Sequence, residues 1–286
     1  MSKAAVSALA LVTALAVVPW GRPIGAQEVP AYLRDRGTGV RSSHLGSYVR
    51  QGELLVYSFF EWYADNNLEY KPSELGYGPS EEDYRGQYRA SEGLLWFGYG
   101  LGADVALEFE MAVITADLTP SPGDTSSGKP AQVSESGLGD VEGQVRWRFQ
   151  RETETRPELF TFFETVFPLQ KTKKIIGTQD WEFSSGLGLT RGFHWGTVTL
   201  RASAEYSAAA NPKFDLGEYA IEYLRRLSPA WRVVAAIEGT QGDEISLLTE
   251  VQWSFAPRAT LKLNSGFGLT ANATDYAPEV GVMFSF

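Results

Sequence analysis

From Glu53 to Phe286 the side chains alternate between apolar and polar with a period of two residues. A strand directs successive side chains to opposite faces of a sheet, whereas a helix of the same residues would scatter the charges around its surface. The stretch 104–113 is a clear example, because one face is apolar and the other is charged or small. The apolar face is Val105, Leu107, Phe109, Met111 and Val113, and the other face is Asp104, Ala106, Glu108, Glu110 and Ala112.

Stretches with this pattern recur about twelve times, and each is near the roughly 9–11 residues with which a tilted strand crosses a bilayer. The pattern predicts an all-β fold, a closed antiparallel transmembrane β-barrel of about twelve strands, with about 10 to 14 also compatible. The predicted strands are 54–63, 88–98, 104–114, 139–149, 158–166, 180–190, 197–206, 216–226, 231–239, 244–255, 259–269 and 277–286.

The connections between these strands alternate in length. Outer-membrane barrels have short periplasmic turns and longer outer loops, and an even number of strands places both chain ends on the periplasmic side. A soluble β-sandwich has no reason to sort its connections in this way. The short connections are 100–103, 151–157, 191–196, 227–230 and 256–258. On the opposite side lie the long connections 65–86, 116–138, 167–179 and 207–215, and the short connection 240–243.

Aromatic residues gather at the ends of the predicted strands. Aromatic side chains collect where hydrocarbon meets lipid headgroups, so two girdles are expected around the barrel. The alternative is ordinary core aromatics in a chain that is 13% aromatic. Beside the short turns lie Tyr99, Phe149, Trp195, Trp231, Phe255 and Phe286, and near the outer ends lie Trp62, Tyr63, Trp181, Tyr206 and Tyr276.

The charged faces of the strands favour a membrane over water. In a soluble barrel these charges would be buried in the core, where an unpaired charge costs several kcal/mol. In a membrane barrel they face an enclosed, wet lumen while the apolar faces meet lipid, and closure leaves no unpaired sheet edge in hydrocarbon. The candidate lumen charges are Glu108, Glu110, Arg146, Arg148, Arg201, Glu205, Glu218, Glu222, Arg232, Glu238, Glu250 and Lys262.

The two ends of the chain indicate export to the outer membrane. Residues 1–26 carry an early Lys3, an apolar run and small residues before Gln27, which is typical of a secretory signal peptide. A membrane anchor is the alternative, but the run is short and no stop-transfer flank follows it. Residues 27–52 are expected to form a periplasmic N-terminal segment, with the barrel over 53–286. The terminal Phe286 on an alternating strand is typical of the signal that barrel-assembly machinery reads, so this machinery and outer-membrane lipids are the expected partners.

Composition narrows the classes further. The formal net charge is −10, which argues against nucleic-acid binding. The chain has no cysteine, which fits an oxidising compartment but is weak on its own. Acidic residues outnumber basic ones on the predicted lumenal faces, and such charge favours cations or neutral polar solutes over anions. Alternatively, a barrel this narrow is filled by side chains, and the charges form a closed network of ion pairs.

One wall of the predicted lumen departs from this polar character. The face that carries Glu61 and Glu92 also presents apolar and aromatic side chains. Either the N-terminal segment 27–52 folds inward as a lumen plug and packs on this strip, or the strip contacts a small apolar solute, or the face is assigned wrongly. The strip consists of Tyr57, Phe59, Leu94 and Trp96, with Leu55 beside them.

Catalysis is not expected. A nucleophilic site needs a base beside its nucleophile, and the two histidines, His44 and His194, are expected to be solvated surface residues. Glu108 and Glu110 share a face, and we expect them to pair with Arg146 and Arg148 on the next strand. The sequence shows no phosphate loop and no zinc or calcium spacing, so no cofactor and no metal site are predicted. The acidic run Ser80–Tyr84 is expected to be a solvated loop.

The stretch Ser136-Gly-Leu-Gly-Asp-Val-Glu-Gly-Gln-Val-Arg-Trp-Arg-Phe149 resembles a strand opening of the outer-membrane barrels named after the meta-pathway of phenol degradation. The resemblance extends over about 54–286. It implies a transporter barrel similar in architecture to channels for hydrophobic compounds, with no agreed binding residues to carry over. The charged lumen departs from that picture. The leading function is therefore passive passage of small solutes across the outer membrane, with hydrophobic or aromatic compounds as one class. A non-conducting structural or surface-interaction barrel is the alternative, and a lipid-modifying enzyme is a third.

Overall fold

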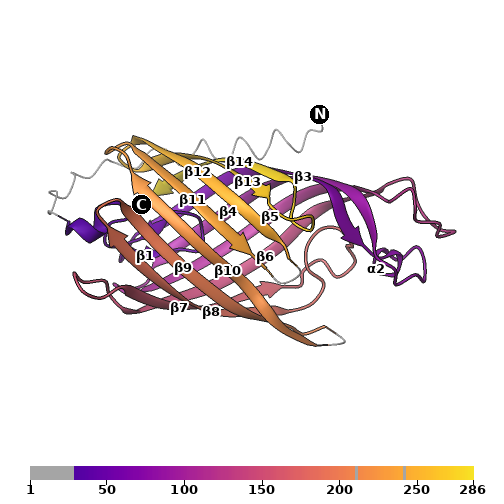
Figure 1. Ribbon diagram of the computed structural model, residues 1–286, viewed down its shortest axis with the longest axis horizontal. Helices are drawn as coiled ribbons and strands as arrows, with labels where there is room; N and C mark the ends of the chain where they lie inside the picture. The colour runs from indigo at the N-terminus through magenta and orange to yellow at the C-terminus, as the bar shows by residue number, and fades with distance from the viewer. Residues whose placement is uncertain (1–28, 210–211, 241–242) are drawn as a thin grey trace.

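The structure, a computed structural model, describes residues 29–209, 212–240 and 243–286. Twelve strands form one closed antiparallel barrel, in which each strand pairs with its neighbours in the chain and β14 pairs with β3 (Figure 1). The predicted all-β closed barrel of about twelve strands is therefore confirmed. The strands are β3 (Leu54–Tyr70), β4 (Tyr84–Gly100), β5 (Val105–Thr119), β6 (Val133–Gln150), β7 (Glu158–Phe167), β8 (Glu182–Phe193), β9 (Gly196–Ser207), β10 (Lys213–Arg226), β11 (Trp231–Gly239), β12 (Ile245–Ala256), β13 (Ala259–Gly268) and β14 (Tyr276–Ser285).

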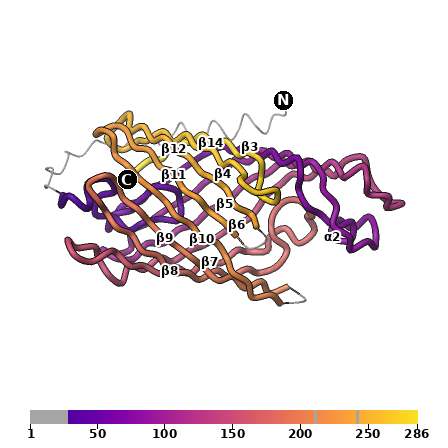
Figure 2. The backbone as a smooth tube through the Cα atoms, viewed as in Figure 1, coloured from indigo at the N-terminus to yellow at the C-terminus, as the bar shows by residue number. Residues whose placement is uncertain are grey.

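Most of the described segment that precedes the barrel, residues 29–52, lies within it. Residues 29–52 begin with the 3-10 helix η2 (Ala31–Leu33) at the short-turn end, and continue into a small hairpin of β1 (Val40–Arg41) and β2 (Tyr48–Val49). Figure 2 shows this indigo segment inside the outline of the barrel, at the end where the C-terminus also lies. The predicted signal peptide, 1–26, lies outside the described residues.

Strands β3 to β6 are longer than the pattern predicts, and parts of the predicted loops 65–86 and 116–138 are strand. They extend past the other strands toward the long-loop end, where the short helix α2 (Pro72–Leu75) lies (Figure 1). The period-two signal reports apolar side chains that face lipid. Beyond the membrane those positions become polar while backbone pairing continues, so the signal ends before the strand does. No helix among the described residues is long and apolar enough to cross a membrane.

The outer surface of the barrel is apolar. Leu187 and Val113, for example, are 63% and 61% exposed although both lie within strands. Nine of the aromatic residues expected in the girdles are exposed at or next to strand ends: Tyr99, Phe149, Trp195, Trp231, Phe255, Phe286, Trp181, Tyr206 and Tyr276. Trp62 is exposed too, but it lies in the middle of β3 because this strand continues to Tyr70. The prediction was wrong for Tyr63, because this side chain packs inside the barrel against the buried cluster of Ala90, Ala112, Ile114, Ala116 and Ile176. Neighbours along a strand point to opposite faces, so Trp62 and Tyr63 cannot both face lipid.

The seam between the first and last barrel strands closes the sheet. Leu54 and Phe286 exchange two backbone hydrogen bonds, of 3.1 and 2.9 Å. Just outside the seam, the Glu53 carboxylate accepts hydrogen bonds from Arg50 and from the Ser285 hydroxyl. Burial alone would raise the pKa of Glu53, but the hydrogen bonds from Arg50 and Ser285 outweigh it and set the pKa below its ordinary value of 4.5.

A test of the lipid-facing surface replaces Leu187, at the middle of β8, with lysine. Leu187→Lys should destabilise the barrel by about 2–4 kcal/mol, because a cation at the bilayer midplane loses its hydration. Leu227→Lys is the matched control, since Leu227 is 62% exposed but lies in a short turn, where the cost should be about 0–1 kcal/mol. The measurement is urea unfolding in lipid vesicles, followed by tryptophan fluorescence. Equal losses at the two positions would contradict a lipid-facing β8.

Glu53→Gln tests the closing seam. A carboxylate whose folded pKa is lowered stabilises the fold fully above its ordinary pKa, and that contribution is lost as the pH falls through the lowered value. The variant should therefore lose about 1–2 kcal/mol at neutral pH. Its difference from the wild type should shrink and disappear as the pH falls from the ordinary pKa of Glu53 through the lowered one. Unfolding in detergent micelles across this pH range measures both, with the exposed Glu154→Gln as control. A difference that persists in acid would contradict the role of the ionised carboxylate.

Candidate functional site in the barrel lumen

The hairpin of the N-terminal segment covers the aromatic strip on the lumen wall. The His44 ring lies 4.4 Å from the ring of Tyr57, 5.6 Å from Phe59 and 5.8 Å from Trp96. The prediction that His44 is a solvated surface residue was therefore wrong, because its side chain lies inside the barrel. Desolvation, and then the nearby Lys262 and Arg41, hold its pKa well below the ordinary value. The surrounding apolar cluster contains Val40, Val49, Leu55, Tyr57, Phe59, Trp96 and Ala106, with Leu94 and Met283 packed against it.

Buried ion pairs fix the start of this segment at the short-turn end. Arg36 lies 2.9 Å from Glu152 and 3.0 Å from Glu158, and the three side chains are almost fully buried. Arg148 on β6 pairs with Glu158 at 3.1 Å and donates a hydrogen bond of 2.9 Å to the carbonyl oxygen of Gly39. The wall of the barrel therefore supplies both charges and hydrogen bonds to the backbone of the segment.

A second group of charged wall residues holds the hairpin. Arg41 forms a 2.7 Å ion pair with Glu222 on β10, and both side chains are buried. On the nearby strand β13, Lys262 lies 3.0 Å from Glu250 and donates a 2.7 Å hydrogen bond to the carbonyl oxygen of Leu45. Several kcal/mol are at stake in each buried pair, because removing one partner leaves the other charge buried and uncompensated.

The tip of the hairpin reaches the middle of the lumen. The backbone N–H of Ser43 donates a 2.6 Å hydrogen bond to Glu108 on β5. The turn needs glycine at Gly46, where φ is +60° and an added Cβ would lie 2.6 Å from Val234 and 2.8 Å from Gln252. The segment is therefore shaped to fit this cross-section of the barrel.

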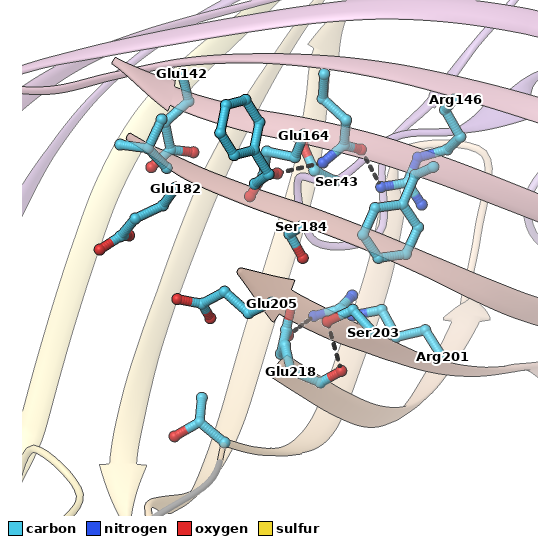
Figure 3. A pocket seen from close by; sticks show the side chains of 15 residues that line it. Ser43, Glu142, Arg146, Glu164, Glu182, Ser184, Arg201, Ser203, Glu205 and Glu218 are labelled. Carbon is cyan, nitrogen blue, oxygen red and sulfur yellow. Dashed lines mark hydrogen bonds and ion pairs between the residues drawn. The ribbon is translucent and has the colours of Figure 1, made fainter. Parts of the chain in front are cut away.

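Above the tip, on the long-loop side, a polar cavity of about 260 Å³ remains. Its acidic residues come from five consecutive strands, β6 to β10, and it also contains two arginines (Figure 3). Phe162 forms part of the wall and lies against Gly186, where a Cβ would come within 2.4 Å of the ring. We call this space the acidic chamber, defined by Ser43, Glu142, Gln144, Arg146, Phe162, Glu164, Val166, Glu182, Phe183, Ser184, Arg201, Ser203, Glu205, Glu218 and Thr240.

The candidate lumen charges lie in two parts of the lumen, the acidic chamber and the part that is filled by residues 29–52. Arg146, Arg201, Glu205 and Glu218 line the acidic chamber, and Glu110 lines a smaller cavity next to it. Against the segment lie Glu108, Arg148, Glu222, Glu250 and Lys262. Glu238 pairs with Arg201. Arg232 shares the inward face of β11 with the buried Val234.

The predicted pairing between β5 and β6 holds for one glutamate only. Arg146 lies 3.3 Å from Glu108, which confirms that pair. Arg148 instead pairs with Asp104 and Glu158. Glu110 has no ion-pair or hydrogen-bond partner among the described residues, because its neighbour across the strands is Glu142. Two facing acids repel each other, so the prediction was wrong at Glu110.

Sequence reasoning did not single out several residues of the site. These are Arg36, which pairs with Glu152 and Glu158, and Arg41, which pairs with Glu222. Both contacts form only because a segment far away in the chain returns into the barrel. One signal was available: residues 27–52 contain four arginines, and the lumen they enter is acidic. Glu142, Glu164 and Glu182 could have been found by extending the inward parity along their strands.

The described residues contain no group of three or more histidine, cysteine, aspartate or glutamate residues that could hold a metal ion. His194, the second histidine, is exposed in a short turn, as predicted. The arrangement of the lumen is instead suited to binding and electrostatic selection of solutes.

No family model and no curated protein matches the chain. Among solved structures it is similar to an outer membrane channel from Pseudomonas putida, with 12% identity, a TM-score of 0.60, and coverage of 82% of this chain and 96% of that one. It is also similar to the KdgM porin, with 9% identity, a TM-score of 0.51, and coverage of 81% and 99%. The fold is thus that of bacterial outer membrane barrels. The resemblance to the phenol-degradation barrels stays a prediction.

Glu222→Gln tests how the segment is held. The change leaves Arg41 buried without its counter-charge, so the hairpin should open more often. In the folded barrel, trypsin should cleave after Arg41 at least about tenfold faster than in the wild type, as measured by mass spectrometry of the released peptides. Glu154→Gln, an equal change of charge on an exposed turn, should leave the rate unchanged. Equal rates in the two variants would show that the Arg41–Glu222 pair does not hold the segment.

Proposed function

We propose that this chain is an outer-membrane channel that passes small polar solutes through its lumen, with residues 29–52 narrowing the short-turn end. The observation that carries the proposal is the lumen itself. On the long-loop side it has a cavity of about 260 Å³ that is lined with charged residues. On the short-turn side it holds residues 29–52, which are not part of the barrel wall. The similarity of the fold to an outer membrane channel and to a porin supports the same class.

The class of solute follows from which surface is free. The aromatic strip of Tyr57, Phe59 and Trp96 is covered by the N-terminal hairpin, so it offers no contact to an apolar solute while the hairpin is in place. The charged residues on the surface that remains open are five glutamates and two arginines, so its net charge is negative. Negative charge along a pore favours cations and neutral polar solutes. Hydrophobic compounds remain a second class that requires the hairpin to leave the strip.

A non-conducting barrel is the competing function, and one observation favours it. The segment is held by buried ion pairs at Glu152, Glu158 and Glu222, which is more than a loosely fitting loop needs. In that case the long connections at the other end would carry the function through contacts at the cell surface.

The same proposal places the chain in the outer membrane, with assembly directed by its last strand. The Phe286 side chain is 41% exposed at the short-turn edge, where assembly machinery could reach it. Lipids of that membrane would surround the apolar outer surface.

Planar bilayers distinguish a channel from a closed barrel. The chain has no cysteine, so cysteines at Ser43 and Glu108 can be joined by a short bis-methanethiosulfonate reagent and released by reductant. The wild type should show cation-selective openings. If the hairpin has to move away from β5 to widen the short-turn end, the bridged variant should conduct at least about tenfold less than the wild type, and reductant should restore conduction. Each single-cysteine variant treated with the same reagent is the control.

Silence of the wild type and of Glu222→Gln at every voltage would overturn the channel and support the closed barrel. Conduction that the bridge leaves unchanged would instead show that ions bypass the segment.

A further inference from the structure

We infer that the acidic chamber binds a small organic cation that also carries a hydrogen-bond acceptor, the combination present in a basic amino acid. This inference names the solute class of the channel, and in that sense it rests on the proposed function. The binding site itself is defined by the chamber, whether or not the barrel conducts.

The chamber has more negative charge than its own arginines neutralise. Five glutamates line it against two arginines. Arg201 forms ion pairs with Glu218 and Glu238. Arg146 forms an ion pair with Glu108, which lies outside the chamber. Among the described residues, no cation lies within ion-pair distance of the remaining chamber carboxylates, which are Glu142, Glu164, Glu182 and Glu205.

The hydrogen bonds of these four carboxylates differ. Glu164 accepts one from Gln144, and Glu182 accepts one of 2.9 Å from the Thr178 hydroxyl. Glu142 and Glu205 accept none from the described residues. Carboxylates placed together without donors repel one another, and a cationic ligand that donates several hydrogen bonds would relieve this repulsion.

A second, independent feature indicates the other half of the ligand. Arg146 is only 2% exposed, yet its Nη1 atom has no hydrogen-bond acceptor among the described residues. The guanidinium also contacts two aromatic rings, because its Cζ atom lies 5.1 Å from the ring centroid of Phe160 and 5.0 Å from that of Phe162. A buried donor without an acceptor is costly, so the free Nη1 suits an acceptor supplied by a ligand.

Trp96, which lines the smaller cavity, also has a buried hydrogen-bond donor without an acceptor. Its side chain is 1% exposed, and its indole Nε1 has no partner among the described residues. Trp96 lines the smaller cavity, of about 20 Å³, together with Glu110, Glu142 and Glu164. A cavity of this size holds a single polar group. Donors that lack acceptors therefore lie beside acceptors that lack donors.

The layout of the charges sets the shape of the ligand. In Figure 3, Arg146 and Arg201 lie on one side of the chamber, while Glu142, Glu182 and Glu205 lie on the other. A ligand with a cation at one end and an acceptor at the other matches this separation. The five glutamates come from five neighbouring strands, and the described residues form no metal-binding cluster. An organic cation therefore fits better than a bare metal ion.

Three probes separate the two halves of the ligand. L-Lysine carries both groups, norleucine lacks the side-chain amine, and cadaverine lacks the carboxylate. Isothermal titration of the purified full-length barrel in detergent should show L-lysine binding at least about tenfold tighter than norleucine. Glu142→Gln should weaken L-lysine by at least about tenfold. Glu81→Gln, the same change on an exposed loop, should leave the affinity unchanged.

Arg146→Lys keeps the positive charge but removes the Nη1 donor. It should weaken L-lysine while leaving cadaverine unchanged, a pattern that a general loss of structure would not give. Heat-modifiable gel mobility confirms that each variant is folded, and if Arg146→Lys does not fold, Glu142→Gln decides alone. Equal affinities for L-lysine and norleucine, or no effect of Glu142→Gln, would overturn the inference. Titration in detergent needs no conduction, so a barrel that binds L-lysine but stays silent in bilayers overturns only the proposed channel.

Discussion

The structure depends on one constraint: inside a bilayer, every backbone N–H and C=O must find its partner within the protein. The closed sheet meets this requirement because β14 returns to pair with β3. Once the sheet is closed, each strand has one face toward lipid and one toward an enclosed space. Charges that could not face hydrocarbon are then collected in the lumen, and their mutual repulsion becomes the next problem that the chain has to solve.

The chain solves that problem differently at the two ends of the lumen. At the short-turn end, its own N-terminal segment contributes Arg36 and Arg41, which neutralise wall glutamates in buried pairs. At the long-loop end, the connection between β7 and β8 packs Ile176 into a buried cluster with Ala112 and Ile114. It brings no counter-ion to the chamber, because Glu142 and Glu205 have none among the described residues. The same set of inward charges therefore serves as a binding surface for the protein's own chain in one half, and leaves a cavity suited to a foreign cation in the other.

The similarity to known structures shows the fold and not the solute. The outer membrane channel from Pseudomonas putida is similar over most of its length, yet only 12% of residues are identical. Lumen chemistry depends on individual side chains, which at this identity are largely different.

The sequence alone determined the barrel, because alternation over a closed sheet is a local property: Leu107 and Glu108 must face opposite ways wherever the strand lies. It also determined the inward charges and the outer aromatic residues. Only the tertiary structure decided what those charges meet. The alternation did not place His44 on Tyr57, pair Arg41 with Glu222, or leave Glu110 and Glu142 side by side, because each contact depends on strand register or on a segment that returns from far away in the chain. The period of two residues specifies a face, whereas a binding site requires a position along the barrel axis.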